Sequence, residues 1–229
     1  MVGVYRVYPK KRSSFFANLS VNSTLILINI ITFIIFTILL ASNILTIDFI
    51  AIKPSNILQG KYLWTFLTSM FMHAPGALTF LSFHLFANML SLLFIGGLVE
   101  KILGAKRYLY FYLGAGLFAG LFFVLSSLIF KGDFDTFAVG ASGALFGLVG
   151  LLMLLTPNLP VYVMFIPIPI KMKYAAPGIL IVLWLISIAG NVGIGNTAHL
   201  GGVVFGLIYG FYLKSKYKNK IKYINKLFS

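Results

Sequence analysis

Residues 138–155 read AVGASGALFGLVGLLMLL, an uncharged stretch with glycine at positions 140, 143, 147 and 150. Its length and apolar character are those of a helix that crosses a lipid bilayer. Small residues let helix backbones approach closely in lipid, where tight packing replaces the hydrophobic effect between helices. The stretch therefore predicts a membrane helix at the centre of a helical bundle.

The rest of the 229-residue chain has the same apolar character. Hydrophobic residues make up 60% of the sequence and charged residues only 10%, whereas an ordinary soluble domain has about 25% charged residues. The composition therefore predicts an all-α, polytopic membrane protein with a single membrane domain. The chain has no cysteine, which excludes disulfides, thiolate metal sites and cysteine nucleophiles.

Segments without Lys, Arg, Asp or Glu predict six membrane spans. They lie at about 21–41, 80–98, 108–130, 138–155, 175–189 and 197–213. The segment Ser42–Thr79 is a long first loop, and its apolar residues, including Trp64 and Phe66, favour a location at the membrane interface. We accordingly divide the chain into a basic tail (residues 1–20), a six-helix domain (21–213) and a second basic tail (214–229).

The charge distribution predicts the orientation of this bundle. The chain has 18 Lys and Arg residues and four acids, for a net charge of +14. Only three of the basic residues, Lys53, Lys61 and Lys131, fall on the side opposite the two tails. Because cytoplasmic segments carry the excess of Lys and Arg, we expect both termini to be cytoplasmic in a cell membrane. Anionic membrane lipid explains the basic tails without a nucleic-acid partner.

The few acids exclude several kinds of membrane enzyme. They are Asp48, Glu100, Asp133 and Asp135, and all lie at the edges of apolar runs. No carboxylate is therefore placed for paired-aspartate proteolysis or for a proton relay inside the membrane. The sequence also lacks an HExxH motif, so zinc proteolysis has no ligands. We expect neither a metal nor a cofactor.

Polar residues inside the spans are the candidates for function. His84 and Asn88 are four residues apart and share one helix face, although each alone is typical of an interhelical hydrogen bond. Ser142 lies near the start of its span, where free N–H groups and the helix dipole stabilise an anion. His199 shares a helical face with Gly202 and Gly206. That face can pack closely on the span 138–155, which would bring the imidazole to the serine, as in an activated nucleophile.

These residues form motifs that resemble the rhomboid family of intramembrane serine proteases. The motifs follow in order over Trp64–Gly210: His84 to Asn88, Glu100 to Gly104 with Arg107, Gly140-Ala141-Ser142-Gly143, and Ala198-His199 with Gly202 and Gly206. The resemblance implies a six-helix bundle that cleaves transmembrane protein substrates with a serine–histidine dyad. The absence of any carboxylate within the spans agrees with a dyad that has no acid.

The resemblance also assigns individual roles. Ser142 resembles the nucleophile and His199 the general base and acid, while His84, Asn88 and the Ser142 backbone N–H resemble the oxyanion hole. For Glu100 and Arg107 we favour a structural role, in which they tie together the cytoplasmic ends of the second and third spans.

The sequence departs from the family pattern at two positions. Thr65 follows Trp64 where many rhomboids have arginine, and Phe146 stands where tyrosine is common. The stretch between His73 and His84 is also long, and we interpret His73 as a loop or interface residue.

Two other functions fit parts of the sequence. A non-catalytic rhomboid-like protein that binds membrane proteins would share the fold, but it would lack the catalytic residues, and both are present here. A small-solute transporter could also have six spans, but it would give no reason for Ser142 and His199 to lie at matching depth. Cleavage of membrane-protein substrates near the outer end of their transmembrane segments is therefore the function that the sequence favours.

Overall fold

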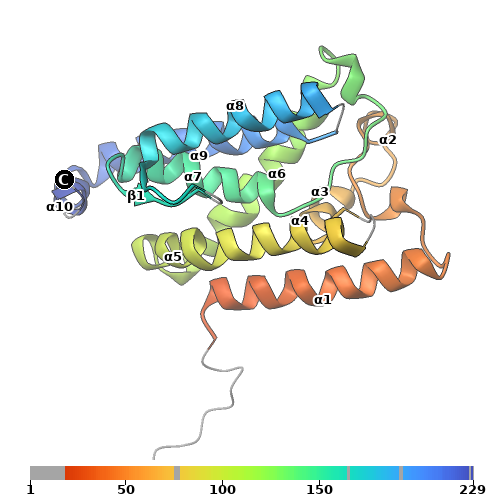
Figure 1. The fold of residues 1–229 in the computed structure, drawn as a ribbon, viewed down its shortest axis with the longest axis horizontal. Helices are drawn as coiled ribbons and strands as arrows, with labels where there is room; N and C mark the ends of the chain where they lie inside the picture. Colours follow the sequence, from red (N-terminus) through yellow and green to blue (C-terminus); the bar gives the residue numbers. More distant parts are fainter. Residues whose placement is uncertain (1–18, 75–77, 164–165, 191–192, 227, 229) are drawn as a thin grey trace, which may run out of the picture.

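The computed structural model describes residues 19–74, 78–163, 166–190, 193–226 and 228. Figure 1 shows a bundle of long, roughly parallel helices with short elements at its two ends. In chain order the elements are α1 (Val21–Ala41), η2 (Ile47–Phe49), α2 (Pro54–Leu58), α3 (Thr65–Thr68), η3 (Ser69–Phe71), α4 (Leu78–Ser91), η4 (Leu92–Gly96), α5 (Gly97–Leu103), α6 (Ala105–Ser126), η5 (Lys131–Asp133), α7 (Ser142–Leu155), β1 (Pro160–Val161), β2 (Ile170–Lys171), α8 (Met172–Gly190), α9 (Asn196–Lys216) and α10 (Lys218–Lys226). The two short strands pair in antiparallel fashion.

Four helices of the described chain are long and apolar enough to cross a membrane. They cover Val21–Ala41, Phe83–Leu103, Ala105–Ser126 and Met172–Gly190. The helix α7 is apolar but has only 14 residues, and α9 has 21 residues but begins with polar side chains. The structure therefore supports a multi-pass membrane protein in which two of the six predicted spans are shorter or more polar than a typical span.

The predicted boundary between the second and third spans was wrong. We expected a loop at residues 99–107, whereas α4, η4 and α5 run on to Leu103 and α6 begins at Ala105. Gly104 alone makes the turn, with a φ of +81° that glycine adopts without a steric penalty. Charged residues such as Lys101 and Lys106 are thus part of the helix ends, because long side chains there reach the polar interface.

Polar contacts fix the start of α1 against the bundle. Ser20 caps the helix by accepting a hydrogen bond from Ser23 N at 3.1 Å. The buried Asn22 side chain donates to Leu92 O at 2.9 Å and accepts from the Tyr108 hydroxyl at 2.6 Å. Leu92 opens the π-helical turn η4, where the wider winding leaves backbone groups to be satisfied by other partners.

The centre of the bundle is α7, as its glycine content predicts. Most of its residues from Ala144 to Leu152 are buried, and it packs against both α6 and α9, which also contact each other. Figure 1 shows the connection from η5 running into the bundle before α7 starts. The first residues of α7 therefore lie below the level at which the neighbouring helices end.

The first loop docks onto the connection that leads into α7. Ile52 pairs with Ala138 in an isolated bridge, and Ser55 Oγ donates to Asp135 at 2.7 Å. Lys53 forms an ion pair with Asp135 at 3.4 Å. These contacts hold the segment before Ser142 in place. Part of the predicted long loop, at residues 75–77, lies outside the described residues.

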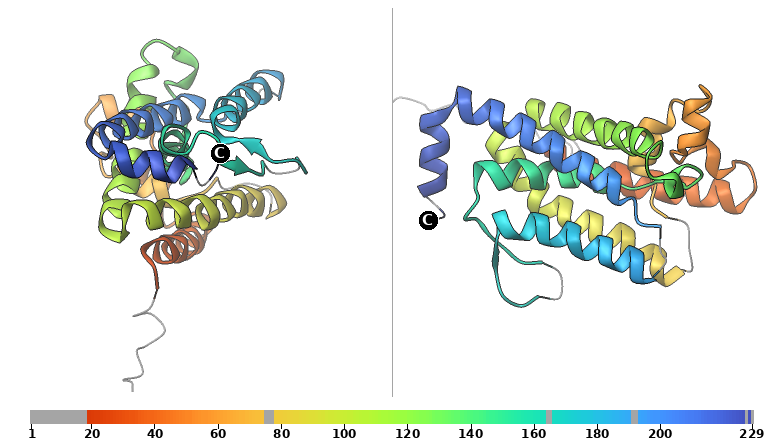
Figure 2. Two further views of the ribbon diagram at one scale, coloured as in Figure 1. Left: turned by 90° about the vertical axis from the view of Figure 1, so that its left-hand side faces the viewer. Right: turned by 90° about the horizontal axis from the view of Figure 1, so that it is seen from above.

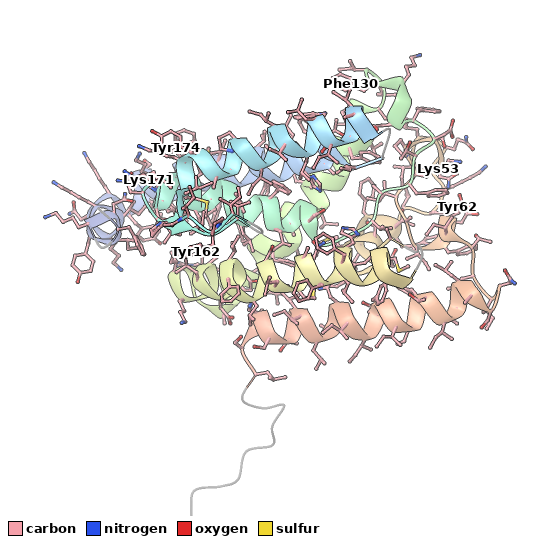
Figure 3. The ribbon with its side chains drawn as sticks, viewed as in Figure 1. Lys53, Tyr62, Phe130, Tyr162, Lys171 and Tyr174 are labelled. Atoms are coloured by element: carbon pink, nitrogen blue, oxygen red, sulfur yellow. The ribbon has the colours of Figure 1, made fainter. Side chains whose placement is uncertain are left out.

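The two ends of the bundle differ in charge. Figure 3 shows Lys171 at one end, near the short hairpin, and Lys53 at the opposite end. We call the first the basic end, because it also carries the lysines of α10, which are exposed from Lys218 to Lys226. Figure 2 shows α10 turned sharply away from the direction of α9. The predicted C-terminal tail is thus helical over most of its length.

Candidate active site

The structure brings Ser142 and His199 together from residues far apart in sequence. The Ser142 Oγ lies 2.8 Å from His199 Nε2, a hydrogen-bond distance. Ser142 is the first residue of α7 and His199 lies in the first turn of α9. The imidazole is 7% exposed, and its Nδ1 has no hydrogen-bond partner among the described residues. No acidic side chain of the described residues therefore bonds to this imidazole.

Glycine contacts between α7 and α9 set this distance. A Cβ added at Gly202 would overlap the carbonyl oxygen of Gly143, and one added at Gly206 would overlap the carbonyl oxygen of Gly147. The two backbones are thus in direct contact along the face of α9 that carries His199. Larger residues would separate the helices and draw the imidazole away from the hydroxyl.

An aromatic ring holds the imidazole from one side. The Phe146 ring stacks on the His199 ring, with 4.5 Å between the centroids and 25° between the planes. Phe146 follows Ser142 by one helical turn, so both contacts of His199 come from the same helix. Stacking does not require the hydroxyl that tyrosine would supply. Phe146, at the position where tyrosine is common in the family, therefore still makes the ring contact with His199.

The residues just before the serine adopt an unusual backbone conformation. Gly140 has a φ of +125°, and its N–H donates to Ser69 O at 2.8 Å. A Cβ at this position would lie 3.1 Å from His84 Nε2. Glycine therefore permits both the positive φ and the close approach of the His84 ring. The helix then begins at Ser142, where its first N–H groups have no partner within the helix.

The predicted oxyanion residue His84 lies beside Gly140, two residues before the serine. His84 Nδ1 accepts a long hydrogen bond from Ala74 N, at 3.4 Å. In a neutral ring the other nitrogen, Nε2, then carries the proton, and this nitrogen is the one close to Gly140. Asn88 is 5% exposed and its amide donates to His84 O at 2.8 Å. One N–H of that amide remains for another acceptor.

His73 lies nearer to this site than the sequence suggested. Its ring packs edge-on against the His84 ring, with 5.2 Å between the centroids. On another side it packs edge-on against the ring of Phe33 in α1, with 6.2 Å between the centroids. It is fully buried, and within the described chain neither ring nitrogen has a hydrogen-bond partner. The contact with His84 was not expected from the sequence, because no spacing rule links the two residues.

The predicted link between Glu100 and Arg107 was wrong. Both Glu100 carboxylate oxygens accept backbone hydrogen bonds at the start of α1, from Val21 N at 2.9 Å and Asn22 N at 3.0 Å. The Arg107 guanidinium instead lies over the Tyr217 ring, 5.9 Å from its centroid. A carboxylate at a helix N-terminus satisfies free N–H groups and the helix dipole. Glu100 therefore ties α5 to α1, not to α6.

The arrangement provides a nucleophile, a base and hydrogen-bond donors in one place. Ser142 can transfer its proton to His199 Nε2 when it attacks a carbonyl group. The α7 N-terminus and His84 Nε2 lie where negative charge on the carbonyl oxygen could be stabilised. No group of three or more His, Asp or Glu residues that could hold a metal occurs in the described part of the chain. The Ser142 and His199 side chains are thus placed as an acyl transfer by a serine nucleophile requires.

Several known proteins are similar in sequence to this chain. The family model described as Rhomboid domain matches residues 60–216. RHOMBOID-like protein 1 of Arabidopsis thaliana is 36% identical over 166 residues, which cover 70% of this chain and 37% of that protein. Rhomboid protein 1, mitochondrial, of Saccharomyces cerevisiae is 31% identical over 142 residues, or 57% of this chain and 38% of that protein.

A bacterial relative carries a protease name. Rhomboid protease GluP of Bacillus subtilis is 29% identical over 167 residues, which cover 70% of this chain and 28% of that protein. The chain spans less than half the length of each of these three relatives. The family match includes every residue of the site, from His84 to His199. The chain belongs to the rhomboid family.

Proposed function

We propose that this chain is an intramembrane serine endopeptidase that cleaves transmembrane protein substrates. The observation that carries the proposal is the 2.8 Å contact between Ser142 Oγ and His199 Nε2 at the N-terminus of a buried helix. A structural serine in a membrane helix would bond to a backbone carbonyl of its own helix, as Ser126 and Ser127 do here. Ser142 instead contacts an imidazole from another helix.

In the proposed mechanism, His199 accepts and returns one proton in each of two steps, acylation and deacylation of Ser142. Ser142 Oγ attacks the carbonyl carbon of the scissile peptide bond while His199 Nε2 accepts the hydroxyl proton. The tetrahedral intermediate then collapses, and His199 returns the proton to the leaving amine. A water that gives its proton to His199 then attacks the acyl carbonyl carbon; the bond to Ser142 Oγ breaks, the acid product leaves, and His199 returns the proton to Oγ. His199 Nδ1 has no partner among the described atoms, so the Phe146 stack and the contact with Ser142 orient the imidazole.

The negative oxygen of the intermediate needs hydrogen-bond donors. The Ser142 N–H, the His84 Nε2–H and the free Asn88 amide N–H are the proposed donors. Gly140 supports this assignment, because a Cβ there would lie 3.1 Å from His84 Nε2 and 3.6 Å from Ser142 Oγ, so both groups border the same position. Such donors act in a site shielded from water, where removing one costs ~10²–10³ in rate.

The proposed topology has six spans, with α7 and α9 completing the bundle. The basic end, where α1 starts and α10 lies, would be cytoplasmic, and Ser142 would lie toward the external side of a cell membrane. Cleavage would then occur near the external end of a substrate helix. Since a fully hydrogen-bonded helix in lipid presents no reactive carbonyl, substrates are expected to contain residues that weaken the helix near the cut.

A reporter assay tests the proposal. The protein, reconstituted in liposomes with a transmembrane reporter, is expected to release a fragment, and Ser142→Ala is expected to abolish the release. Ser215→Ala, an exposed serine at the basic end, is the matched control and should keep full activity. A fluorophosphonate probe should label the wild type but not Ser142→Ala. An unlabelled, inactive wild type would instead favour a non-catalytic rhomboid-like binder.

A further inference from the structure

A cavity separate from the Ser142–His199 site lies between the connection after α6, the C-terminal part of α8 and the start of α9. It has a volume of about 250 Å³, and its lining includes Phe130, Asp133, Trp184, Asn196 and Thr197. Figure 3 labels Phe130 at the end of the bundle opposite Lys171. Because α8 spans most of a bilayer, its C-terminal end reaches the depth of the lipid headgroups. None of the lining residues is basic.

The carboxylate of this cavity has no positive partner. Asp133 is half-buried and accepts a hydrogen bond from Thr197 Oγ1 at 3.3 Å. No Lys or Arg nitrogen in the described chain lies within ion-pair distance of it, whereas Asp135, two residues further on, pairs with Lys53. Burial raises the pKa of Asp133 above its usual value, and a cation beside the carboxylate would favour its charged form.

A second polar group in the same cavity, the amide oxygen of Asn196, has no hydrogen-bond donor among the described residues. Asn196 is 5% exposed, and its Oδ1 has no hydrogen-bond partner within the described residues. A buried amide oxygen without a donor is costly, so a missing donor belongs at this position. The cavity thus holds one carboxylate that no Lys or Arg of the described residues pairs with, and one amide oxygen that accepts no hydrogen bond from them.

Aromatic side chains complete the lining. Phe130 comes from the connection after α6 and Trp184 from the helix α8, and both line the cavity. Aromatic rings attract a cation near their faces, tryptophan most strongly. We propose that this pocket binds the primary ammonium group of a lipid headgroup, as in phosphatidylethanolamine. A primary ammonium offers three N–H donors, which suits Asp133 and Asn196, whereas the choline headgroup offers none.

The expected binding can be followed by tryptophan fluorescence. The chain has two tryptophans, so in a Trp64→Phe background the signal reports on Trp184 alone. Titration of this protein in detergent with short-chain phosphatidylethanolamine should change the Trp184 emission, and phosphatidylcholine should bind about tenfold more weakly. Asp133→Asn should weaken phosphatidylethanolamine binding about tenfold, while Asp135→Asn, in the same loop but outside this pocket, should leave it unchanged.

Three outcomes would overturn the proposal. The first is equal affinity for phosphatidylethanolamine and phosphatidylcholine, and the second is an equal loss of affinity in Asp133→Asn and Asp135→Asn. The third is binding of free ethanolamine as tight as that of the lipid, which would assign the pocket to soluble amines. Thermal unfolding of each variant separates loss of binding from loss of fold. If Asp133→Asn is unstable, Trp184→Leu, read by native mass spectrometry of bound lipid, tests the same pocket without changing a charge.

Discussion

At the scale of single residues, Asn88 serves both the helix and the proposed chemistry. One amide N–H bonds to His84 O, 2.8 Å away, and the second remains for a substrate oxygen. Asn88→Ala is therefore expected to lower kcat by ~10²–10³ with little change in KM, because the lost bond forms fully only in the transition state. Steady-state cleavage of the reporter measures both constants.

Asn219→Ala, in the helix α10 away from the site, is the matched control for this change. It should keep both constants, and both variants should unfold at the temperature of the wild type. A kcat for Asn88→Ala within twofold of the wild type would remove Asn88 from the proposed oxyanion hole and leave it a purely structural residue of α4.

The ring of Phe146 gives a second prediction at this scale. It stacks on His199 at 4.5 Å, and such contacts contribute about 0.5–1.5 kcal/mol. Phe146→Ala is expected to lower kcat by roughly threefold to tenfold, while Phe146→Tyr, which keeps the ring, should retain most of the activity. Reporter cleavage by both variants checks this. Equal activity of the alanine and tyrosine variants would mean that the stack does not orient the imidazole.

At the scale of elements, the crossing of α7 and α9 depends on glycine. A Cβ at Gly202 would overlap the Gly143 carbonyl oxygen, so Gly202→Ala must push the two helices apart. Overpacking of this kind costs about 1–3 kcal/mol, and it also lengthens the Ser142–His199 contact. We therefore expect a lower unfolding temperature together with a loss of activity.

Gly178→Ala is the matched control for this crossing. Gly178 lies in α8, and a Cβ there would meet no atom within 4 Å. Because alanine favours helix over glycine by about 0.5–1 kcal/mol, this variant should be as stable as the wild type or slightly more stable. Thermal unfolding in detergent compares the two variants, and equal unfolding temperatures would contradict the close packing of α7 on α9.

The elements also differ in how far sequence could predict them. The bounds of α1 followed from its apolar run, and the contact between α7 and α9 from the spacing of Gly202 and Gly206 behind His199, because both signals are local. The partner of Glu100 could not be predicted in this way. Its bonds join residues 78 and 79 positions apart, and nothing in the local sequence distinguishes them from a bond to the nearby Arg107.

Length and polarity explain the remaining differences. The helix α7 starts inside the bundle, so it needs fewer residues than a full span, and the polar start of α9 carries His199 to the same depth. A rule that requires about 20 apolar residues for a span fits neither helix. The contact between His73 and His84 was missed for a related reason, because the loop that joins them has no periodic pattern.

At the scale of the whole molecule, the charge asymmetry predicts the orientation in the membrane. The basic end carries exposed lysines from Lys214 to Lys226, and Glu100, its one predicted acid, is bonded to the start of α1. At the opposite end Lys53 pairs with Asp135, and three lysines stand against three aspartates in the sequence. Since positive segments stay in the cytoplasm, we expect Ser142 to open toward the external side.

The natural lack of cysteine makes this orientation directly measurable. Ser215→Cys places one thiol at the basic end and Gln59→Cys places one in the exposed part of the first loop. A membrane-impermeant maleimide applied to intact cells should label only the Gln59→Cys protein, and permeabilised cells should allow both to be labelled. Labelling of Ser215→Cys in intact cells would reverse the topology, and the proposed cut would then lie on the cytoplasmic side of the substrate.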